Sequence, residues 1–315
     1  MYATTLFRQL SKPFGSNQST VEELKEVNLV DHYTYKFQFL YKSIRGLIKK
    51  QNISTDVRKI YKVGFTINEQ EYLKWQNTFQ TLEEDVNFSF YLKSSTALFL
   101  RFTKDLGVNY KNILHLRNEL EYKKQGHIFT PGKYKNAAWV SNILTAGKKN
   151  LILKFSSKVK NDNGVLIATN VDYFMVKNVD AETIAAVKAQ EANKLNYRKW
   201  LIPQKFEQEQ TQVTEVMVPK NMGLQYGAVS GDMNMVHTTT FFAKIFGFKR
   251  AFVQGLCTAN YVVSNSPFKT NFEAFSINFS KPVYTNSKVK ITYGSSGYCV
   301  RNGQNHVVAH GEYSL

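Results

Sequence analysis

An internal repeat of predicted elements constrains the fold of this chain more than any other feature. In the first half, a strand pattern at 62–68 and a helical pattern at 69–79 are followed by a helix pattern at 88–102 and a strand pattern at 113–122. The second half repeats this order at 215–218, 224–229, 253–264 and 275–283. Because each half combines helices with strands, the repeat predicts an α+β fold made of two similar units.

Each half ends in a predicted β-hairpin. The strand patterns 151–159 and 165–176 are joined by Asn161-Asp162-Asn163-Gly164, and 289–298 and 306–313 are joined by Arg301-Asn302-Gly303-Gln304. Asparagine and glycine suit such turns because they tolerate positive φ. One unit of this kind leaves a sheet edge exposed, so we expect the two units to pair side by side and extend the sheet.

The repeat divides the chain into four predicted segments. Residues 61–180 and 213–315 are the two units, and 181–212 is the crossover between them. The crossover is rich in Ala, Lys, Glu and Gln, and their propensity predicts a helix over 181–193. Residues 1–60 form a tail and an extension, and we expect some helix between 21 and 59.

One short segment in the second unit carries candidate chemistry. Residues 230–237 read Ser-Gly-Asp-Met-Asn-Met-Val-His, which places Asp232 five positions before His237. Residues at that spacing do not share a helix face, but a loop containing Gly231 and Asn234 brings them together. A carboxylate beside a histidine is suited to activating one water molecule by general acid and base action. The segment is therefore a candidate active site.

This segment is similar to a known motif. Ser230-Gly231-Asp232-x-Asn234-x-x-His237, followed by Gln254-Gly255-Leu256 and the strand pattern 277–283, resembles the hydratase motif of MaoC-like dehydratases. The chain departs from that motif at Met235, where the family usually has proline, and at Gln254, where it usually has histidine. Residues 285–287 replace a usual Gly-Asp pair.

The resemblance implies a double hot-dog fold and a reaction. Asp232 and His237 would jointly activate the water, Asn234 would hold the loop or orient the water, and the backbone N–H near Gly255 would bind the thioester carbonyl. The implied substrates are acyl thioesters of coenzyme A or of acyl carrier protein. The resemblance implies no cofactor. Lys249 and Arg250 could contact a phosphate of the coenzyme or of a phosphopantetheine arm, or simply lie in a solvated loop.

The first unit differs from the second at the matching place. Residues 74–90 offer Glu83, Glu84 and Asp85 but no histidine. The resemblance implies that this unit has lost its catalytic residues and accommodates the acyl tail, although a degenerate repeat also serves as structural padding. The other histidines lack a partnered motif, and we predict structural roles for them: His32, His115, His127, His306 and His310.

The charge of the chain is strongly positive. The net charge is +17, and no Asp or Glu occurs between 122 and 161. Such a face could attract an acidic carrier protein, coenzyme phosphates, RNA or an anionic membrane, or could be a solvated surface alone. The lysines of this stretch are Lys123, Lys124, Lys133, Lys135, Lys148, Lys149, Lys154, Lys158 and Lys160.

Other features bear on the environment of the protein. No apolar run reaches the ~20 residues that a membrane-spanning helix needs. Cys257 and Cys299 give neither a disulfide framework nor a metal-binding spacing, so we expect buried thiols, a reducing compartment and no metal site. Residues 1–21 contain Arg8 and Lys12 but no acid, which suits a mitochondrial presequence or a disordered basic tail. We expect the mitochondrial matrix, with the peroxisome or the cytosol as alternatives.

Two functions of different classes follow from these features. The first is a hydro-lyase of fatty-acid metabolism that interconverts (3R)-hydroxyacyl and trans-2-enoyl thioesters. The alternative is a non-catalytic structural subunit of a large mitochondrial assembly, with or without RNA. A hot-dog thioesterase is a third reading, and a homodimer or a larger assembly fits either of the first two.

Overall fold

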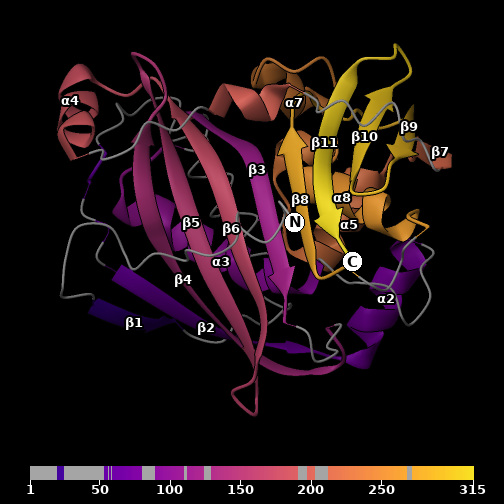
Figure 1. Cartoon of the computed structure of the whole chain (residues 1–315), viewed down its shortest axis with the longest axis horizontal. Helices are drawn as coiled ribbons and strands as arrows, with labels where there is room; N and C mark the ends of the chain where they lie inside the picture. The colour runs from indigo at the N-terminus through magenta and orange to yellow at the C-terminus, as the bar shows by residue number, and fades with distance from the viewer. Residues whose placement is uncertain are drawn as a thin grey trace.

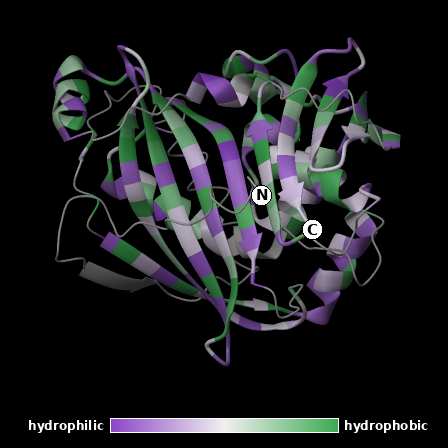
Figure 2. Cartoon of the chain, in the orientation of Figure 1, coloured by the Kyte–Doolittle hydropathy of each residue, from purple (hydrophilic) through white to green (hydrophobic). Residues whose placement is uncertain are grey.

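Alternation of exposed and buried side chains determines the strands. In β2 (Lys59–Ile67), every second residue from Tyr61 to Ile67 is buried, while Lys62 and Thr66 between them are exposed. This period of two places apolar side chains on one face of a strand and polar ones on the other. Figure 2 shows hydrophobic and hydrophilic residues alternating along several neighbouring strands.

The computed structural model describes residues 20–24, 53–55, 57, 59–79, 89–109, 112–123, 129–190, 197–202, 212–267 and 272–315. The remaining strands are β1 (Thr20–Leu24), β3 (Ile113–Tyr122), β4 (Gly132–Thr145), β5 (Asn150–Asn161), β6 (Leu166–Lys177), β7 (Gln212–Val218), β8 (Ala274–Phe279), β9 (Ser287–Tyr293), β10 (Gly297–Asn302) and β11 (Val307–Ser314). The helices are α2 (Glu69–Phe79), α3 (Ser89–Asp105), α4 (Ala181–Gln190), α5 (Met222–Ser230), α6 (Met235–Thr238), α7 (Thr240–Ile245), α8 (Gly255–Ser264) and the 3-10 helix η4 (Tyr197–Leu201).

The strands form one 11-stranded sheet in the order β1-β2-β4-β5-β6-β3-β8-β11-β10-β9-β7. Helix α3 lies behind the strands of the first half, and α5 and α8 lie behind those of the second (Figure 1). Two curved halves, each wrapped on a helix and joined edge to edge, make a double hot-dog of the α+β class. The predicted fold class is confirmed.

The two halves join through β3 and β8. These strands pair antiparallel, with Arg117 opposite Asn278 and Glu121 opposite Ala274. The pairing gives each half a hydrogen-bonded neighbour along an edge that would otherwise be exposed. The predicted side-by-side pairing of the two units is therefore confirmed.

A buried polar network crosses this seam. Arg117 donates from Nε to Glu119 Oε1 (2.7 Å) and from Nη1 to Asn278 Oδ1 (2.7 Å). The guanidinium also lies over the ring of Trp200, at 5.7 Å from its centroid. Trp200 belongs to η4, so the crossover segment covers the seam. The backbone carbonyl of Trp200 accepts a hydrogen bond from His310 Nε2 on β11 (2.8 Å), so His310 has a structural contact.

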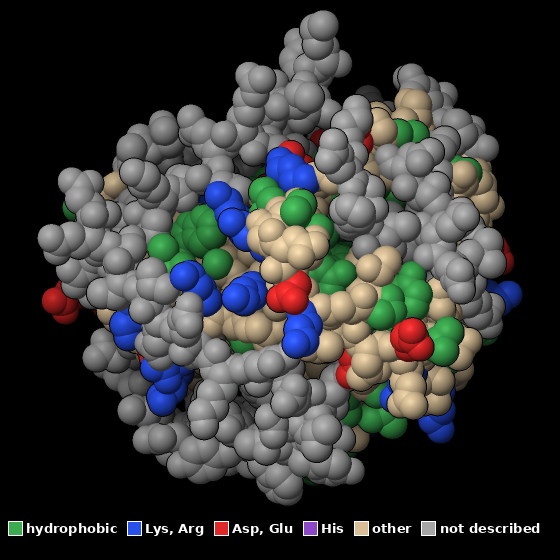
Figure 3. Space-filling model, turned by 90° about the horizontal axis from the view of Figure 1, so that it is seen from below, with side chains coloured by type: hydrophobic (Ala, Val, Ile, Leu, Met, Phe, Trp, Pro, Cys, Tyr) green, Lys and Arg blue, Asp and Glu red, His purple; other side chains and the backbone are tan. Residues whose placement is uncertain are grey.

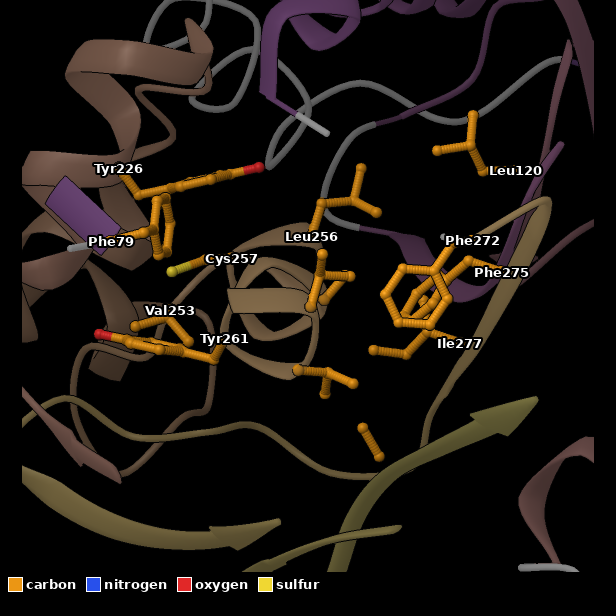
Figure 4. Packing of buried hydrophobic residues seen from close by; sticks show 14 of the residues in the cluster. Phe79, Leu120, Tyr226, Val253, Leu256, Cys257, Tyr261, Phe272, Phe275 and Ile277 are labelled. Carbon is orange, nitrogen blue, oxygen red and sulfur yellow. The ribbon is translucent and has the colours of Figure 1, made fainter. Parts of the chain in front are cut away.

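The main hydrophobic core draws on both halves of the chain. Around α8, Phe79 of α2 packs edge to face on Tyr226 and Tyr261, with ring centroids 5.9 Å and 5.6 Å apart (Figure 4). Cys257 is buried beside these rings and Cys299 is buried in β10, and both are free thiols as predicted. Burial raises the pKa of Cys257, so this thiol is protonated and serves as a core residue.

Most of the predicted elements are confirmed, and the exceptions have local causes. The single strand predicted over 289–298 is wrong, because residues 294–296 turn the chain and separate β9 from β10, with Gly294 N–H bonded to the carbonyl of Gly297 (2.8 Å). The expected helical character between 21 and 59 is not found in the described residues, where β1 runs parallel to β2. The presequence pattern, His32, His127 and the acidic cluster at 83–85 lie outside the described residues.

Candidate active site

The acid of the motif lies on a short connection between two helices, and the histidine lies in the second of these helices. Helix α5 ends at Ser230 and is followed by its C-cap Gly231, whose φ of 81° is left-handed and favours glycine. Gly231 donates its N–H to the carbonyl of Gly227 (3.0 Å), and α6 begins only four residues later at Met235. The chain therefore reverses between Asp232 and His237, as the spacing of the two residues requires.

Asp232 is fixed mainly through its backbone. Its N–H donates to Ser230 Oγ (3.2 Å), and its carbonyl accepts from Gln254 Nε2 (2.8 Å). Its carboxylate atom Oδ1 accepts from the N–H of Asn234 (3.3 Å). Asn234 in turn caps α6, with Oδ1 accepting from Val236 N–H (3.3 Å). These bonds hold the loop and leave Asp232 Oδ2 available to a ligand.

His237 is held in one tautomer. Its Nδ1 lies 2.8 Å from the carbonyl of Phe252. Since a carbonyl only accepts, Nδ1 carries the hydrogen, and the neutral ring has its lone pair on Nε2. Burial lowers the pKa of His237. The nearby Asp232 carboxylate and the hydrogen bond to the Phe252 carbonyl act in the opposite direction and raise this pKa. The imidazole is therefore neutral near pH 7 and able to accept a proton.

Gly223 in α5 permits the close approach of the backbone at His237. A Cβ placed on Gly223 would lie 1.9 Å from the carbonyl oxygen of His237. No side chain fits in that space, and backbone atoms cannot move aside as the end of a side chain does. The sequence signal for this residue is weak, because a glycine inside a helix pattern has several explanations.

Helix α8 begins beside the acid and the histidine. Gly255 is its first residue, and the first amides of a helix lack partners within the helix. A Cβ on Gly255 would lie 2.9 Å from the ring of Phe279, so only glycine leaves room between this ring and the helix start. Unpaired amides and the helix dipole favour negative charge at this point.

These groups line one cavity of about 500 Å³. Asp232, Asn234, His237 and Gly255 all contribute to its wall. The cavity continues into the first half of the chain, where α3 and the inner face of β5 and β6 line it. The residues contributed by that half include Leu98, Phe99, His115, Phe155, Ser157, Asn170, Asp172 and Phe174.

Lys249 and Arg250 are placed outside this cavity wall. Both side chains are exposed, and the Arg250 guanidinium lies over the ring of Tyr284 at 5.5 Å from its centroid. They follow α7 and precede Phe252, whose carbonyl holds His237. A contact of either side chain with a phosphate remains a prediction.

A second acid–histidine pair lies in the first half. His115 Nε2 is 3.0 Å from Asp172 Oδ1, and both residues line the cavity. The sequence shows no partnered motif around His115, and the structure supplies the partner through the fold. The two residues lie on β3 and β6 and meet only through the register of these strands, which no short motif encodes.

The described residues show neither a metal-binding cluster nor a membrane-spanning helix. The described part of the chain holds no group of three His, Cys, Asp or Glu side chains that could bind a metal ion. Within the same residues, each helix is too short or too polar to cross a membrane.

Comparison with known proteins identifies the class of this domain. Residues 201–314 match the family described as "MaoC like domain". The resemblance that its motif predicts is therefore confirmed for this part of the chain. The amino-acid sequence has no significant match among curated proteins.

Solved structures extend the likeness to most of the chain. HtdX of Mycobacterium tuberculosis aligns with a TM-score of 0.60 and 15% identity, over 81% of this chain and 98% of its own. A MaoC-like dehydratase from Phytophthora capsici aligns with a TM-score of 0.56 and 16% identity, over 81% of this chain and 95% of its own.

A longer protein shares the same fold. The peroxisomal multifunctional enzyme type 2 of Drosophila melanogaster aligns with a TM-score of 0.60 and 17% identity, over 81% of this chain. This chain spans about half of that protein, 48% of its length. At these identities the alignments establish the fold, and the reaction has to be argued from the site.

Proposed function

We propose that this protein is a hydro-lyase that interconverts trans-2-enoyl and (3R)-hydroxyacyl thioesters of coenzyme A or acyl carrier protein. The observation that supports the proposal most strongly is the convergence of Asp232, His237 and the start of α8 on one cavity. An acid, a neutral imidazole and unpaired helix amides are the groups that hydration of an enoyl thioester needs. The match of residues 201–314 to the MaoC like domain supports the same reaction class.

In the hydration direction, Asp232 and His237 hold one water molecule between them. The water oxygen bonds to C3 of the enoyl group while the pair takes one of the water protons. The electrons of the double bond move to C2 and the thioester carbonyl, and C2 then receives a proton from the pair. The product carries a hydroxyl at C3 and a new hydrogen at C2, so all atoms of the water are retained.

The amides at the start of α8 bind the carbonyl oxygen as it gains negative charge. The glycine at position 255 permits this approach because it has no side chain between the helix start and Phe279. Loss of one such donor typically costs about 3 kcal/mol of transition-state stabilisation. The acyl chain then extends into the part of the cavity that the first half lines.

The proposal is tested by incubating the purified chain with crotonyl-coenzyme A and a longer enoyl analogue. The absorbance of the enoyl thioester should fall with wild-type protein. Asp232→Ala and His237→Ala should each lower the rate by about two to four powers of ten, the usual contribution of acid–base groups, without a change in thermal unfolding. His306→Ala, which removes an exposed histidine, is the matched control and should retain full activity.

Full activity in both site variants would overturn the proposal. Absence of activity in the wild type, together with co-migration of the chain with a megadalton complex during native purification, would instead support a structural subunit of an assembly.

For the carrier of the thioester, we infer that an acidic protein docks on exposed lysines of β4 and β5. Lys135 and Lys160 are exposed and directly opposite each other in the register of β4 and β5. Like charges at such positions repel, and an anionic partner would offset that repulsion. Figure 3 shows Lys and Arg side chains gathered near the middle of one face of the molecule.

Charge reversal tests this surface. Lys135→Glu with Lys160→Glu should raise KM for an enoyl-acyl carrier protein severalfold at low salt, and added salt should reduce the difference. Lys188→Glu with Lys288→Glu, which reverses two exposed lysines on α4 and β9, serves as the control. An equal KM in both double variants would contradict the docking surface.

A further inference from the structure

The wall of the cavity in the first half is polar where an alkyl chain would favour apolar contacts. Along β6, Asn170, Asp172 and Phe174 alternate with outward-facing residues, so all three lie on the same side of the strand and line the cavity. On β5, Ser157 is directly opposite Asn170 and lines the cavity as well. Asn170 and Ser157 are 2% and 5% exposed.

Hydrogen bonds fix this group of side chains. Asp172 Oδ1 accepts from Asn118 Nδ2 (2.6 Å) and lies 3.0 Å from His115 Nε2. Its other oxygen, Oδ2, accepts from Asn170 Nδ2 (2.7 Å). Both carboxylate oxygens therefore have donors, and the geometry of the group is set before any ligand enters.

Two polar atoms of the group have unused capacity. Ser157 Oγ and Asn118 Oδ1 are buried, and neither has a hydrogen-bond partner in the described part of the chain. A buried polar atom without a partner is unfavourable, because it has given up its hydrogen bonds to water. Because Ser157 lines the cavity, a bound ligand can supply the missing partner.

The group lies deeper in the cavity than the start of α8. The ring of Phe279, which borders Gly255, is 4.8 Å from the ring of His115. From His115 the polar group continues along β6 to Asn170, which is buried. A thioester with its carbonyl at Gly255 and its carrier toward solvent would place its acyl chain, rather than its pantetheine arm, beside Ser157.

We propose that His115, Asp172, Asn170 and Ser157 form a second subsite that binds a hydroxyl group carried by the acyl chain. This inference rests on the proposed function and narrows its substrate class. A hydroxyl suits the group because it both donates to and accepts from Ser157 Oγ. A carboxylate does not suit it, because the charge of Asp172 would repel a second anion. A plain alkyl chain would leave Ser157 without a partner.

The test measures binding, which does not require turnover. Saturated acyl-coenzyme A pairs of equal length, with and without one hydroxyl at successive chain carbons, are titrated by calorimetry. For at least one position, the wild type should bind the hydroxylated chain about tenfold more tightly, the effect of one well-formed hydrogen bond. Ser157→Ala and Ser157→Val should reduce that ratio to about one.

Ser156→Ala is the matched control, because the Ser156 hydroxyl lies on the opposite face of β5 from Ser157 and already donates to Ser141 Oγ (2.8 Å). It should keep the preference of the wild type. Equal binding of both chains at every position, or an unchanged ratio in the Ser157 variants, would overturn the subsite. A preserved preference in a protein that hydrates no enoyl thioester would support the subsite and contradict the proposed function.

Discussion

His237 shows how local structure prepares one residue for catalysis. The Phe252 carbonyl fixes the hydrogen on Nδ1, and burial keeps the ring neutral. Neither property depends on a ligand, so the base is available before the substrate binds. The lowered pKa of His237 therefore predicts the direction in which activity changes with pH.

Activity should be retained to lower pH than an ordinary histidine would permit. The neutral ring is the active form, and its pKa lies below the usual value of 6.5. A plot of log kcat/KM against pH should therefore bend at a value below 6.5. The folded state should also lose stability as the pH falls from 6.5 through the lowered pKa, because the unfolded chain binds the proton more readily. An acidic limb centred at or above 6.5 would contradict the assignment of His237 as the base.

At the scale of single residues, the sequence predicted the site residues that lie close together in one continuous motif. Asp232, Asn234 and His237 lie within six consecutive residues, and their spacing with Gly231 indicates that they converge. His115 and Asp172 belong to strands far apart in the sequence, and a β-bulge between His115 and Arg117 changes the register near them. A pairing that depends on such an irregularity has no local sequence signal.

At the scale of elements, Gln254 connects three parts of the site. Its Nε2 donates to the carbonyl of Gly223 in α5 (3.1 Å) and to that of Asp232 in the loop (2.8 Å). The same residue occupies the N-cap position of α8. One amide thus sets the position of the loop relative to the helix whose amides face the substrate.

Gln254→Leu should loosen this arrangement. Two buried carbonyls would lose a donor, which should reduce the free energy of unfolding by about 1–3 kcal/mol and lower kcat more than it raises KM. Gln254→His, which restores the residue usual in the family motif, should recover part of the activity because an imidazole N–H can serve one carbonyl. Urea denaturation and steady-state kinetics measure both effects. Unchanged kcat in Gln254→Leu would show that Gln254 does not position the loop.

Strand β4 escaped prediction for a physical reason. In β4, Lys133 and Lys135 alternate with buried Tyr134 and Asn136, and the buried amide of Asn136 interrupts the apolar pattern. That amide donates to Ser94 Oγ of α3 (2.9 Å), a tertiary contact that sequence periodicity does not reveal. Long apolar segments such as α8 and β8 were predictable because burial alone determines them.

At the scale of the whole molecule, the seam between the halves depends on Arg117. Removing its guanidinium would leave the Glu119 carboxylate buried without its cation. Arg117→Met should therefore reduce the free energy of unfolding by about 3–5 kcal/mol, measured by urea denaturation. Adding Glu119→Gln should recover part of the loss, whereas Lys160→Met on the exposed face should change little. Equal stability of Arg117→Met and the wild type would mean that strand pairing alone holds the seam.

The joining of the halves also explains why the cavity is long. The second half supplies the acid, the histidine and the helix start, and the first half supplies the deeper wall. Neither unit alone encloses the proposed acyl chain. The repeat in the sequence predicted this pairing, but the polar lining of the deeper wall emerged only from the structure.

The most direct test of the proposed water addition follows the oxygen atom of the water. The protein is incubated with an enoyl thioester in isotopically labelled water, and the products are analysed by mass spectrometry. One labelled oxygen should appear as a hydroxyl at C3 of an intact thioester, and Asp232→Asn should abolish the incorporation. Label in a released carboxylic acid, with liberation of the free thiol, or an absence of label in the acyl chain would contradict the account.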